Sequence, residues 1–322
     1  MTVSFCSIYQ HLSSKSMVGF PIFVVFCQCR DLIINIYNGG NPLMNKLSFG
    51  LIGHPLGHSI SPAVHQHLFN LSGLDAEYNL YDIPPEDLSK QWETLRQLDG
   101  FNITIPYKQT VFPLLDIIDR SAAQYRAANT AQCMDGETKG FNTDVIGFHK
   151  ALETAAIPLA GHVLLCGTGG VSHMMAYEAL RNDCSLTIGA RTFGKAATLA
   201  DKLSKRFPRA QIEPAALAYV SGSYDLILNG TPVGMYPHTK KMPIPLNVAR
   251  SSRAVFDAIY NPQETQLLAR ARAAGAKVQN GLPMLVWQAA AAQEIWTGKS
   301  FSPADIDAIC QKMRAYIKEN FT

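Results

Sequence analysis

The chain has 322 residues, of which 47% are hydrophobic, and its formal net charge is +3 at pH 7. This length is enough for two ordinary hydrophobic cores, so we expect two domains. The lysines and arginines are scattered, which does not favour nucleic acid or an acidic membrane surface as a partner. The seven cysteines form no CxxC pair, so neither a disulfide framework nor a cysteine-based zinc site is favoured, and a reducing cytoplasm fits best.

Residues 1–43 differ from the rest of the chain. Lys15 is followed by an apolar run from Met17 to Cys27, which is too short to span a bilayer as a helix. The small-x-small cleavage site of a signal peptide does not follow this run. Met44 stands directly before a strand-like segment, so we expect residues 1–43 to lie outside the fold.

From residue 47 onward, predicted strands and helices alternate. A buried strand over 47–53 precedes a helix that Ser61 caps, Pro62 opens and Gly73 ends. A strand over 76–83, an amphipathic helix over 86–98 and a strand over 100–106 follow. Asp135-Gly136 indicates a hairpin at the end of this first unit.

A helix from about Val145 leads to a second alternation. Short apolar strands that alternate with helices predict a parallel sheet with both faces covered. The tail forms two predicted helices, and Ser302-Pro303 opens the second. The predicted segments are strands at 162–167, 185–190, 224–230, 254–260 and 277–280, and tail helices at 282–298 and 302–320.

The segment from His162 carries the pattern of a dinucleotide-binding turn. Gly167 suits the tight turn, and Gly169 lets the backbone approach a pyrophosphate at the helix N-terminus. Ser172 occupies the third glycine position. An ordinary strand-to-helix turn is the alternative, but the surrounding strand, turn, helix and strand favour a nucleotide site.

The end of the next strand indicates which nucleotide is bound. An NAD site usually has a carboxylate there, about 20 residues on, for the ribose 2′-hydroxyl. Here Arg191 stands at this point and Lys195 lies one helical turn further on. An arginine can pair with a 2′-phosphate through two parallel hydrogen bonds, so NADP is favoured over NAD. The alternative is that both are ordinary exposed charges at a helix start.

Four polar clusters lie at predicted strand ends or helix starts, where open α/β folds bind ligands. Each cluster alone has an ordinary explanation as a cap, a turn or an exposed charge, but together they indicate a site. The clusters are Ser59 with Ser61, then Asn102 with Thr104 and Lys108, then Asn129, and then Asn142 with Asp144.

Eight motifs connect these clusters to a known family. In order and spacing the sequence resembles the shikimate dehydrogenases, of the shikimate/quinate dehydrogenase family. The resemblance runs from about Leu47 to the last helix, and Ala190 and Lys195 depart from the asparagine and arginine that are common there. The motifs are “GHSISPAVH”, “FNITIPYK”, “AANT”, “GFNTD”, “GTGGVS”, “NGTPVGM”, “YNPQET” and “LPMLVWQAA”.

The resemblance implies a two-domain α/β fold with an N-terminal substrate-binding domain and a C-terminal Rossmann-like NADP-binding domain. The final helices would return to the first domain, giving bounds of 44–144 plus about 286–322 and of 145–285. It also implies that Ser59 and Ser61 bind the substrate carboxylate, that Thr104, Asn129 and Gln288 bind its hydroxyls, that Tyr260 helps to close the site, and that Lys108 and Asp144 form the catalytic pair. The implied cofactor residues are Gly167, Thr168, Gly169, Gly170, Val171, Ala190, Arg191, Thr192, Lys195 and Gly281.

The expected chemistry agrees with this assignment. Reduction of a ketone needs a hydride at carbon and a proton at the forming alkoxide. An ammonium such as that of Lys108 can stabilise the negative charge and donate the proton, and a carboxylate such as that of Asp144 would orient it. Whether Lys108 donates the proton or acts only through its charge stays open at this point.

The main interpretation is an NADP-dependent oxidoreductase that reversibly reduces 3-dehydroshikimate to shikimate, as a monomer or homodimer. One alternative is a quinate or quinate/shikimate dehydrogenase that uses NAD or both cofactors. Another is a non-catalytic nucleotide or metabolite sensor. A metal site is not expected, because His54 and His58 flank a proline and a glycine, while His65 and His67 face different ways on a helix.

Overall fold

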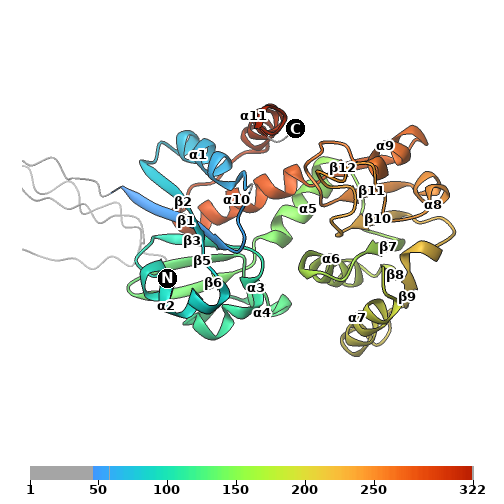
Figure 1. Cartoon of the computed structure of the whole chain (residues 1–322), viewed down its shortest axis with the longest axis horizontal. Coiled ribbons are helices and arrows are strands. Elements are labelled where there is room, and N and C mark those ends of the chain that lie inside the picture. The colour runs from blue at the N-terminus through green and yellow to red at the C-terminus, as the bar shows by residue number, and fades with distance from the viewer. Residues whose placement is uncertain (1–45, 58, 321–322) are drawn as a thin grey trace, which may run out of the picture. The chain divides into compact units, whose positions relative to one another are not determined.

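The structure is a computed structural model that describes residues 46–57 and 59–320 (Figure 1). By its internal contacts the chain divides into residues 1–44 and residues 45–322. The expectation that residues 1–43 stand apart from the fold therefore concerns a segment outside the described residues. Within the described part, no helix combines the length and the apolar character that crossing a membrane needs.

The first sheet has six strands in the order β2-β1-β3-β5-β6-β4. β1 pairs in parallel with β2 and β3, whereas β5 runs antiparallel to β3 and β6. The predicted hairpin at Asp135-Gly136 is confirmed, since both residues have positive φ angles between β5 and β6. Its elements are β1 (Leu47–Gly53), α1 (Ser61–Ser72), β2 (Ala76–Asp82), α2 (Leu88–Leu95), β3 (Gly100–Ile103), α3 (Tyr107–Thr110), β4 (Ile117–Ile118), α4 (Arg120–Tyr125), β5 (Thr130–Met134) and β6 (Glu137–Phe141).

The second sheet also has six strands, in the order β12-β11-β10-β7-β8-β9, and every pair is parallel. This order places β7 at the centre, with the chain first running to one edge and then to the other, as in a Rossmann fold. Its elements are α5 (Asp144–Thr154), β7 (His162–Cys166), α6 (Gly170–Arg181), β8 (Ser185–Ala190), α7 (Phe193–Arg206), β9 (Ile212–Ala216), β10 (Leu226–Asn229), α8 (Leu246–Ser251), β11 (Ala254–Asp257), α9 (Gln266–Ala273) and β12 (Lys277–Asn280).

The last two helices, α10 (Leu282–Thr297) and α11 (Pro303–Asn320), return to the first sheet. Residues of both helices share an apolar cluster with Val64 and Leu68 of α1. α10 also packs against α5, where Gly147 lies so close to the Met284 backbone that a side chain would collide. These contacts agree with the expected return of the tail to the first half of the protein.

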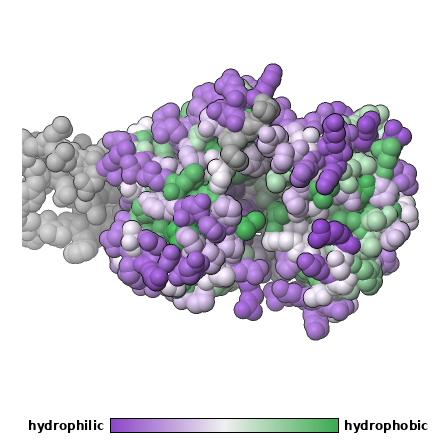
Figure 2. Space-filling view, viewed as in Figure 1, coloured by the Kyte–Doolittle hydropathy of each residue, from purple (hydrophilic) through white to green (hydrophobic). Residues whose placement is uncertain are grey.

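Burial follows the predicted periodicity in most elements. Leu88, Trp92 and Leu95 of α2 are all buried, as their spacing on one helix face requires. The strands β7, β10 and β11 are buried along most of their length, because helices cover both faces of a parallel sheet. On the face drawn in Figure 2, hydrophilic side chains are spread over the surface, with apolar patches between them.

Two helix starts differ in how they are capped. The prediction for Ser302 is confirmed, because its hydroxyl accepts from the Asp305 amide and the Asp305 carboxylate accepts from Ser302. The prediction that Ser61 caps α1 is wrong. α1 begins at Ser61, and no side chain forms a capping hydrogen bond at its start. The Ser61 amide donates to the Ser59 hydroxyl at 3.3 Å.

Candidate active site

A cavity of about 640 Å³ brings together residues that are far apart in the sequence. All eight predicted substrate residues line it, and so do two of the predicted cofactor residues, Val171 and Gly281. This volume suits a small-molecule ligand. The eight residues are Ser59, Ser61, Thr104, Lys108, Asn129, Asp144, Tyr260 and Gln288.

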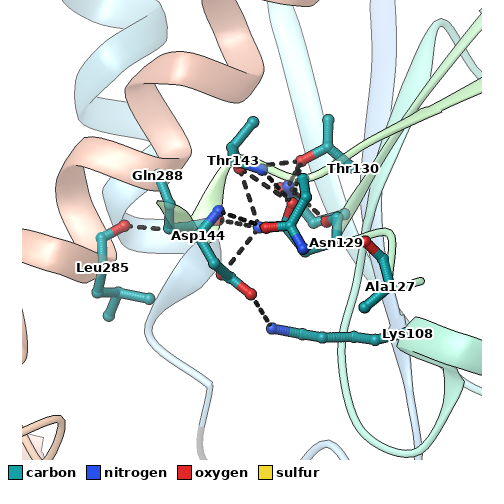
Figure 3. A network of polar contacts seen from close by, with 10 residues as sticks. Lys108, Ala127, Asn129, Thr130, Thr143, Asp144, Leu285 and Gln288 are labelled. Atoms are coloured by element: carbon teal, nitrogen blue, oxygen red, sulfur yellow. Dashed lines mark hydrogen bonds and ion pairs between the residues drawn. The ribbon is translucent and has the colours of Figure 1, made fainter. Parts of the chain in front are cut away.

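Lys108 and Asp144 form an ion pair in the wall of this cavity (Figure 3). The Lys108 Nζ lies 2.6 Å from the Asp144 Oδ2. Lys108 is in the short helix α3, and Asp144 is the first residue of α5. Their side chains are 29% and 15% exposed, so the pair is shielded from bulk water yet open to a ligand.

The backbone around Lys108 is held on two sides. The Tyr107 hydroxyl donates to the Ile83 carbonyl, and Tyr107 itself is buried. The Lys108 carbonyl accepts from the Ala128 amide at 2.7 Å. α3 is therefore fixed directly beside Asn129, and the direction of the lysine side chain does not depend on the Asp144 contact alone.

Asn129 is the centre of a buried polar network (Figure 3). Its Nδ2 lies within hydrogen-bond distance of the Thr143 Oγ1, the Asp144 Oδ1 and the Gln288 Oε1, at 2.9, 2.9 and 3.2 Å. Its Oδ1 accepts from the Thr143 amide at 2.6 Å. One side chain thus connects the loop before α5 with helix α10.

Asn102 belongs to the same network, but its side chain binds other residues of the fold. Its Oδ1 accepts from the Tyr78 hydroxyl at 2.8 Å, and its Nδ2 donates to the Asn129 carbonyl and to Thr130. These contacts occupy the side chain, which is 4% exposed. Asn142 is similarly occupied, since its amide donates to the Ala127 carbonyl and its oxygen accepts from the Asp144 amide.

The glycine turn after β7 has the geometry that the sequence predicts. Gly167 has a φ of +109°, and a side chain there would meet Ser172 and Thr231. Gly169 and Gly170 face open space, and α6 begins at Gly170 with amides that no helical turn precedes. Backbone amides at a helix N-terminus bind phosphate groups, so this turn fits a dinucleotide pyrophosphate.

The serine in the third glycine position is accommodated by a glycine that follows another strand. Ser172 is buried, and its hydroxyl lies against Gly230, where a side chain would collide with it. The close contact between helix and strand that the third glycine usually allows is therefore provided here by Gly230 after β10. This role of Gly230 was not predicted from the sequence, although the residue lies in the “NGTPVGM” motif.

Arg191, Thr192 and Lys195 lie at the end of β8 and the start of α7, and all three are exposed. Among the described residues, neither Arg191 nor Lys195 takes part in an ion pair. Their charges are thus available to a ligand at the end of β8, and a 2′-phosphate is the group that would use them. Arg191, Thr192 and Lys195 do not line the cavity of about 640 Å³, and neither do Gly167 to Gly170 or Ala190.

A buried polar network holds the loops after β10 and β11. The Asp257 carboxylate accepts from Thr265, Asn229 and the Ile259 amide. Burial raises the pKa of Asp257 to about 6, although these three hydrogen bonds act to lower it. Asn229 in turn accepts from the amide and hydroxyl of Thr231, which fixes the loop after β10.

His65, His54 and Cys166 are packed against or bonded to other residues of the fold. Burial lowers the pKa of His65 to about 3, and its ring stacks on that of Tyr78 with 4.0 Å between the ring centroids. His54 lies 2.7 Å from Asp82. In the described residues, no group of three or more histidine, cysteine or acidic side chains could hold a metal ion. Cys166 is fully buried in β7, which raises the pKa of its thiol.

Among the residues in and around the cavity that were not predicted, Thr143 and Met235 lie in motifs of the site. Thr143, which bridges Asn129 and Thr130, stands between the two selected residues of the “FNTD” motif. Met235 lines the cavity from the “NGTPVGM” motif. Both lie inside motifs that were recognised, and this position is the signal that could have identified them.

The fold and site together define a class: a two-sheet α/β protein with a dinucleotide-type glycine turn beside a polar cavity that contains a lysine–aspartate pair. Family models agree with this class. Residues 51–131 match the shikimate dehydrogenase substrate binding domain, and residues 281–306 match the shikimate 5′-dehydrogenase C-terminal domain.

Similar proteins cover nearly the whole described part of the chain. “Shikimate dehydrogenase (NADP(+))” of Shouchella clausii is 40% identical over 259 residues, which are 78% of this chain and 93% of that protein. The protein of the same name from Methanocaldococcus jannaschii is 40% identical over 257 residues, 77% of this chain and 90% of that protein. A crystal structure of shikimate 5-dehydrogenase from Thermus thermophilus in complex with NADP(H) and shikimate has a TM-score of 0.74 at 32% identity, covering 83% of this chain and 99% of that one. The chain belongs to the shikimate dehydrogenase family.

Proposed function

We propose that this chain is an NADP-dependent shikimate dehydrogenase, an oxidoreductase of aromatic amino acid biosynthesis that reversibly reduces 3-dehydroshikimate to shikimate. One observation carries the proposal. The Lys108–Asp144 pair, with 2.6 Å between its charged atoms, lies in a cavity that all eight expected substrate residues line. Family membership at 40% identity supports the same reaction.

The residues of the cavity suit the groups of this substrate. Ser59 and Ser61 present hydroxyls at the start of α1, where they can bind the substrate carboxylate. Thr104, Asn129 and Gln288 supply donors and acceptors for its hydroxyls. Tyr260 lines the cavity from the loop after β11, where it can help to close the site.

In the direction of ketone reduction, Lys108 Nζ donates a proton to the carbonyl oxygen as that oxygen becomes a hydroxyl. In the reverse direction the neutral amine accepts the proton of the hydroxyl. Asp144 Oδ2 keeps Nζ in place, while Asn129 holds the other carboxylate oxygen. An ammonium that is already oriented stabilises the developing oxyanion without rearrangement.

The glycine turn and the basic residues after β8 fit NADP. The pyrophosphate would bind at the start of α6, the 2′-phosphate at Arg191 and Lys195, and the nicotinamide beside Gly281 and Val171, which line the substrate cavity. When bound, NADPH supplies the hydride. We further propose a cytoplasmic enzyme, a monomer or homodimer, with domains of residues 44–144 plus about 286–322 and of residues 145–285.

A nicotinamide absorbance assay tests the reaction directly. The full chain is incubated with shikimate or quinate, each with NADP or NAD, and formation of the reduced cofactor is followed. We expect the highest kcat/KM with shikimate and NADP. A preference for quinate or NAD would support the alternative dehydrogenase, and no turnover with any pair, together with cofactor binding, would support a sensor.

Lys108→Ala tests the assigned proton donor. A positioned general acid contributes about 10² to 10⁴ in rate, so kcat should fall by at least about a hundredfold. Binding of NADP, measured by calorimetry, should stay within about twofold of the unchanged protein. Lys312→Ala, on α11, is the matched control and should leave kcat unchanged; an unaltered kcat in the Lys108 variant would refute the assignment.

A further inference from the structure

A second cavity, of about 320 Å³, lies on another side of the catalytic pair. Its lining residues come from α3, α4 and α5 and from α6 and α7. We infer that this cavity is a separate binding site for a small aromatic carboxylate, and that its occupation slows turnover.

The walls of the cavity suit an aromatic ring. Tyr125 of α4 and Tyr177 of α6 meet edge to face, with 5.4 Å between their ring centroids. Met174 and Leu203 add apolar surface beside them. An inserted ring could pack against these side chains, since aromatic pairs prefer edge-to-face and offset contacts. A volume near 320 Å³ has room for a single substituted ring rather than a nucleotide.

The charges around the cavity suit an anion. Arg126, Lys202 and Arg206 line it, and none of them takes part in an ion pair among the described residues. Of the described lining residues one is acidic, Asp144, and Lys108 already pairs with it. A carboxylate would meet cations that no acidic side chain neutralises, and charge-assisted hydrogen bonds are the stronger kind. Arg206 lies over the Tyr177 ring and its guanidinium is 3.4 Å from the Tyr177 hydroxyl, so it borders the aromatic wall.

The second cavity communicates with the first through two residues. Lys108 and Asp144 line both cavities. A carboxylate in the second cavity would offer Lys108 an alternative partner to Asp144 and so draw the ammonium away from the substrate. Because the inhibitor and the substrate occupy different cavities, inhibition should lower kcat while leaving the KM for shikimate unchanged.

The cavity differs from the expected cofactor site. Of the ten expected cofactor residues, Gly170 lines it, while Arg191 and Lys195 at the start of α7 do not. Lys202 and Arg206 belong to the later turns of that helix. A free phosphate would satisfy the cations but leave the tyrosine and leucine surface uncovered, so an aromatic acid fits better.

Calorimetric titration with 4-hydroxyphenylacetate tests the site in the full chain, with and without saturating NADP and shikimate. We expect binding in all conditions, and at least tenfold weaker binding of the neutral amide, 4-hydroxyphenylacetamide. The double substitution Lys202→Gln with Arg206→Gln should weaken binding of the acid by about tenfold or more, since two charge-assisted contacts are lost.

Lys205→Gln is the matched control, because Lys205 is exposed on the same helix and does not line the cavity. It should change the affinity by less than about twofold. Displacement of the acid by NADP or by shikimate would place it in the sites already described and overturn the inference, as would equal binding by the double variant or no binding at millimolar concentration. The titration needs no turnover, so its failure is distinguishable from failure of the proposed reaction.

Discussion

At the scale of single residues, the Asn129 amide has more partners than it can serve. Its Nδ2 carries two hydrogens but lies within reach of three oxygens, on Thr143, Asp144 and Gln288. At any moment one of these oxygens lacks the amide hydrogen. A hydroxyl of a bound substrate can donate to it, so the network is arranged to receive one more donor rather than being complete by itself.

Arg191 is the residue that should decide between the two nicotinamide cofactors. Its guanidinium is exposed at the end of β8, and a bidentate contact to a 2′-phosphate contributes roughly 1.5–3 kcal/mol. Arg191→Ala should therefore raise the KM for NADP by about tenfold or more and leave the KM for NAD within about twofold. Steady-state assays with both cofactors measure the two values.

Arg209→Ala supplies a comparison for this substitution, because Arg209 lies in the turn after α7, outside the glycine turn and the end of β8. It should leave both KM values unchanged. An equal loss with NADP and NAD in the Arg191 variant would mean that the side chain supports the fold and does not recognise the phosphate.

At the scale of elements, sequence predicted most strands and helices because their apolar periodicity and boundary residues agree. β7, β10 and β11 contain apolar runs that end at a polar residue or before a glycine. β9 was missed because Pro214 interrupts it, and a proline is tolerated there since β9 is an edge strand. β4 was missed because it has two residues.

Most residues of the candidate site could also be predicted, but from short motifs and not from apolar periodicity. Its residues lie in short motifs at strand ends, and parallel strands bring those ends together. The second cavity was not predictable, since its lining comes from α3, α4, α5, α6 and α7 without a motif. The convergence of Tyr125 and Tyr177 depends on how the helices pack, and no local pattern in the sequence records it.

The substitution Gly281→Ala tests how tightly the start of α10 is packed. A side chain at this position would collide with the Ala258 backbone, which cannot move without disturbing β11. Gly281→Ala should lower the free energy of unfolding by about 1–3 kcal/mol, the usual range for overpacking, and weaken NADP binding. Denaturant unfolding and calorimetry measure the two effects.

Gly194→Ala is the matched control, because Gly194 lies in the first turn of α7 and faces open space. Alanine is the better helix former, so this variant should be as stable as the unchanged protein or slightly more so. Equal stability of both variants would contradict the close contact at Ala258.

At the scale of the whole described molecule, Glu178 joins the two halves. It lies on α6 with its side chain 4% exposed. Its carboxylate accepts from the Tyr125 hydroxyl of α4 at 2.5 Å and lies 2.7 Å from His149 of α5 and 3.4 Å from Arg181. Burial acts to raise the pKa of Glu178, but the hydrogen bonds from His149 and Tyr125 outweigh it, and the pKa is lowered.

The lowered pKa of Glu178 predicts a dependence of stability on pH. A carboxyl whose pKa is lower in the folded than in the unfolded state stabilises the fold above its unfolded pKa, and this contribution is lost as the pH falls through the folded-state value. Glu178→Gln should therefore be less stable than the unchanged protein at pH 7, by about 1–3 kcal/mol for lost bonds to a buried charge. The difference should shrink below about pH 4, near the unfolded pKa.

Denaturant unfolding of both proteins between pH 3 and pH 8 measures this difference. Glu153→Gln, on the exposed side of α5, is a suitable comparison and should show little effect at any pH. A constant difference between the Glu178 variant and the unchanged protein across this range would mean that the charge of Glu178 is unimportant to the junction.

The return of α10 and α11 to the first sheet has a consequence for biosynthesis. When the chain has been synthesised as far as residue 281, all the described strands of both sheets are present. α1 still lacks its apolar neighbours on α10 and α11, which are Leu282, Val286, Ile306 and Ile309. The half with the second sheet can fold while translation continues, whereas the core of the first half is complete only after α10 and α11 have been synthesised. A nascent chain would hence lack a complete cavity until α10 has been made, and termination before Gln288 would yield a product without a finished catalytic centre.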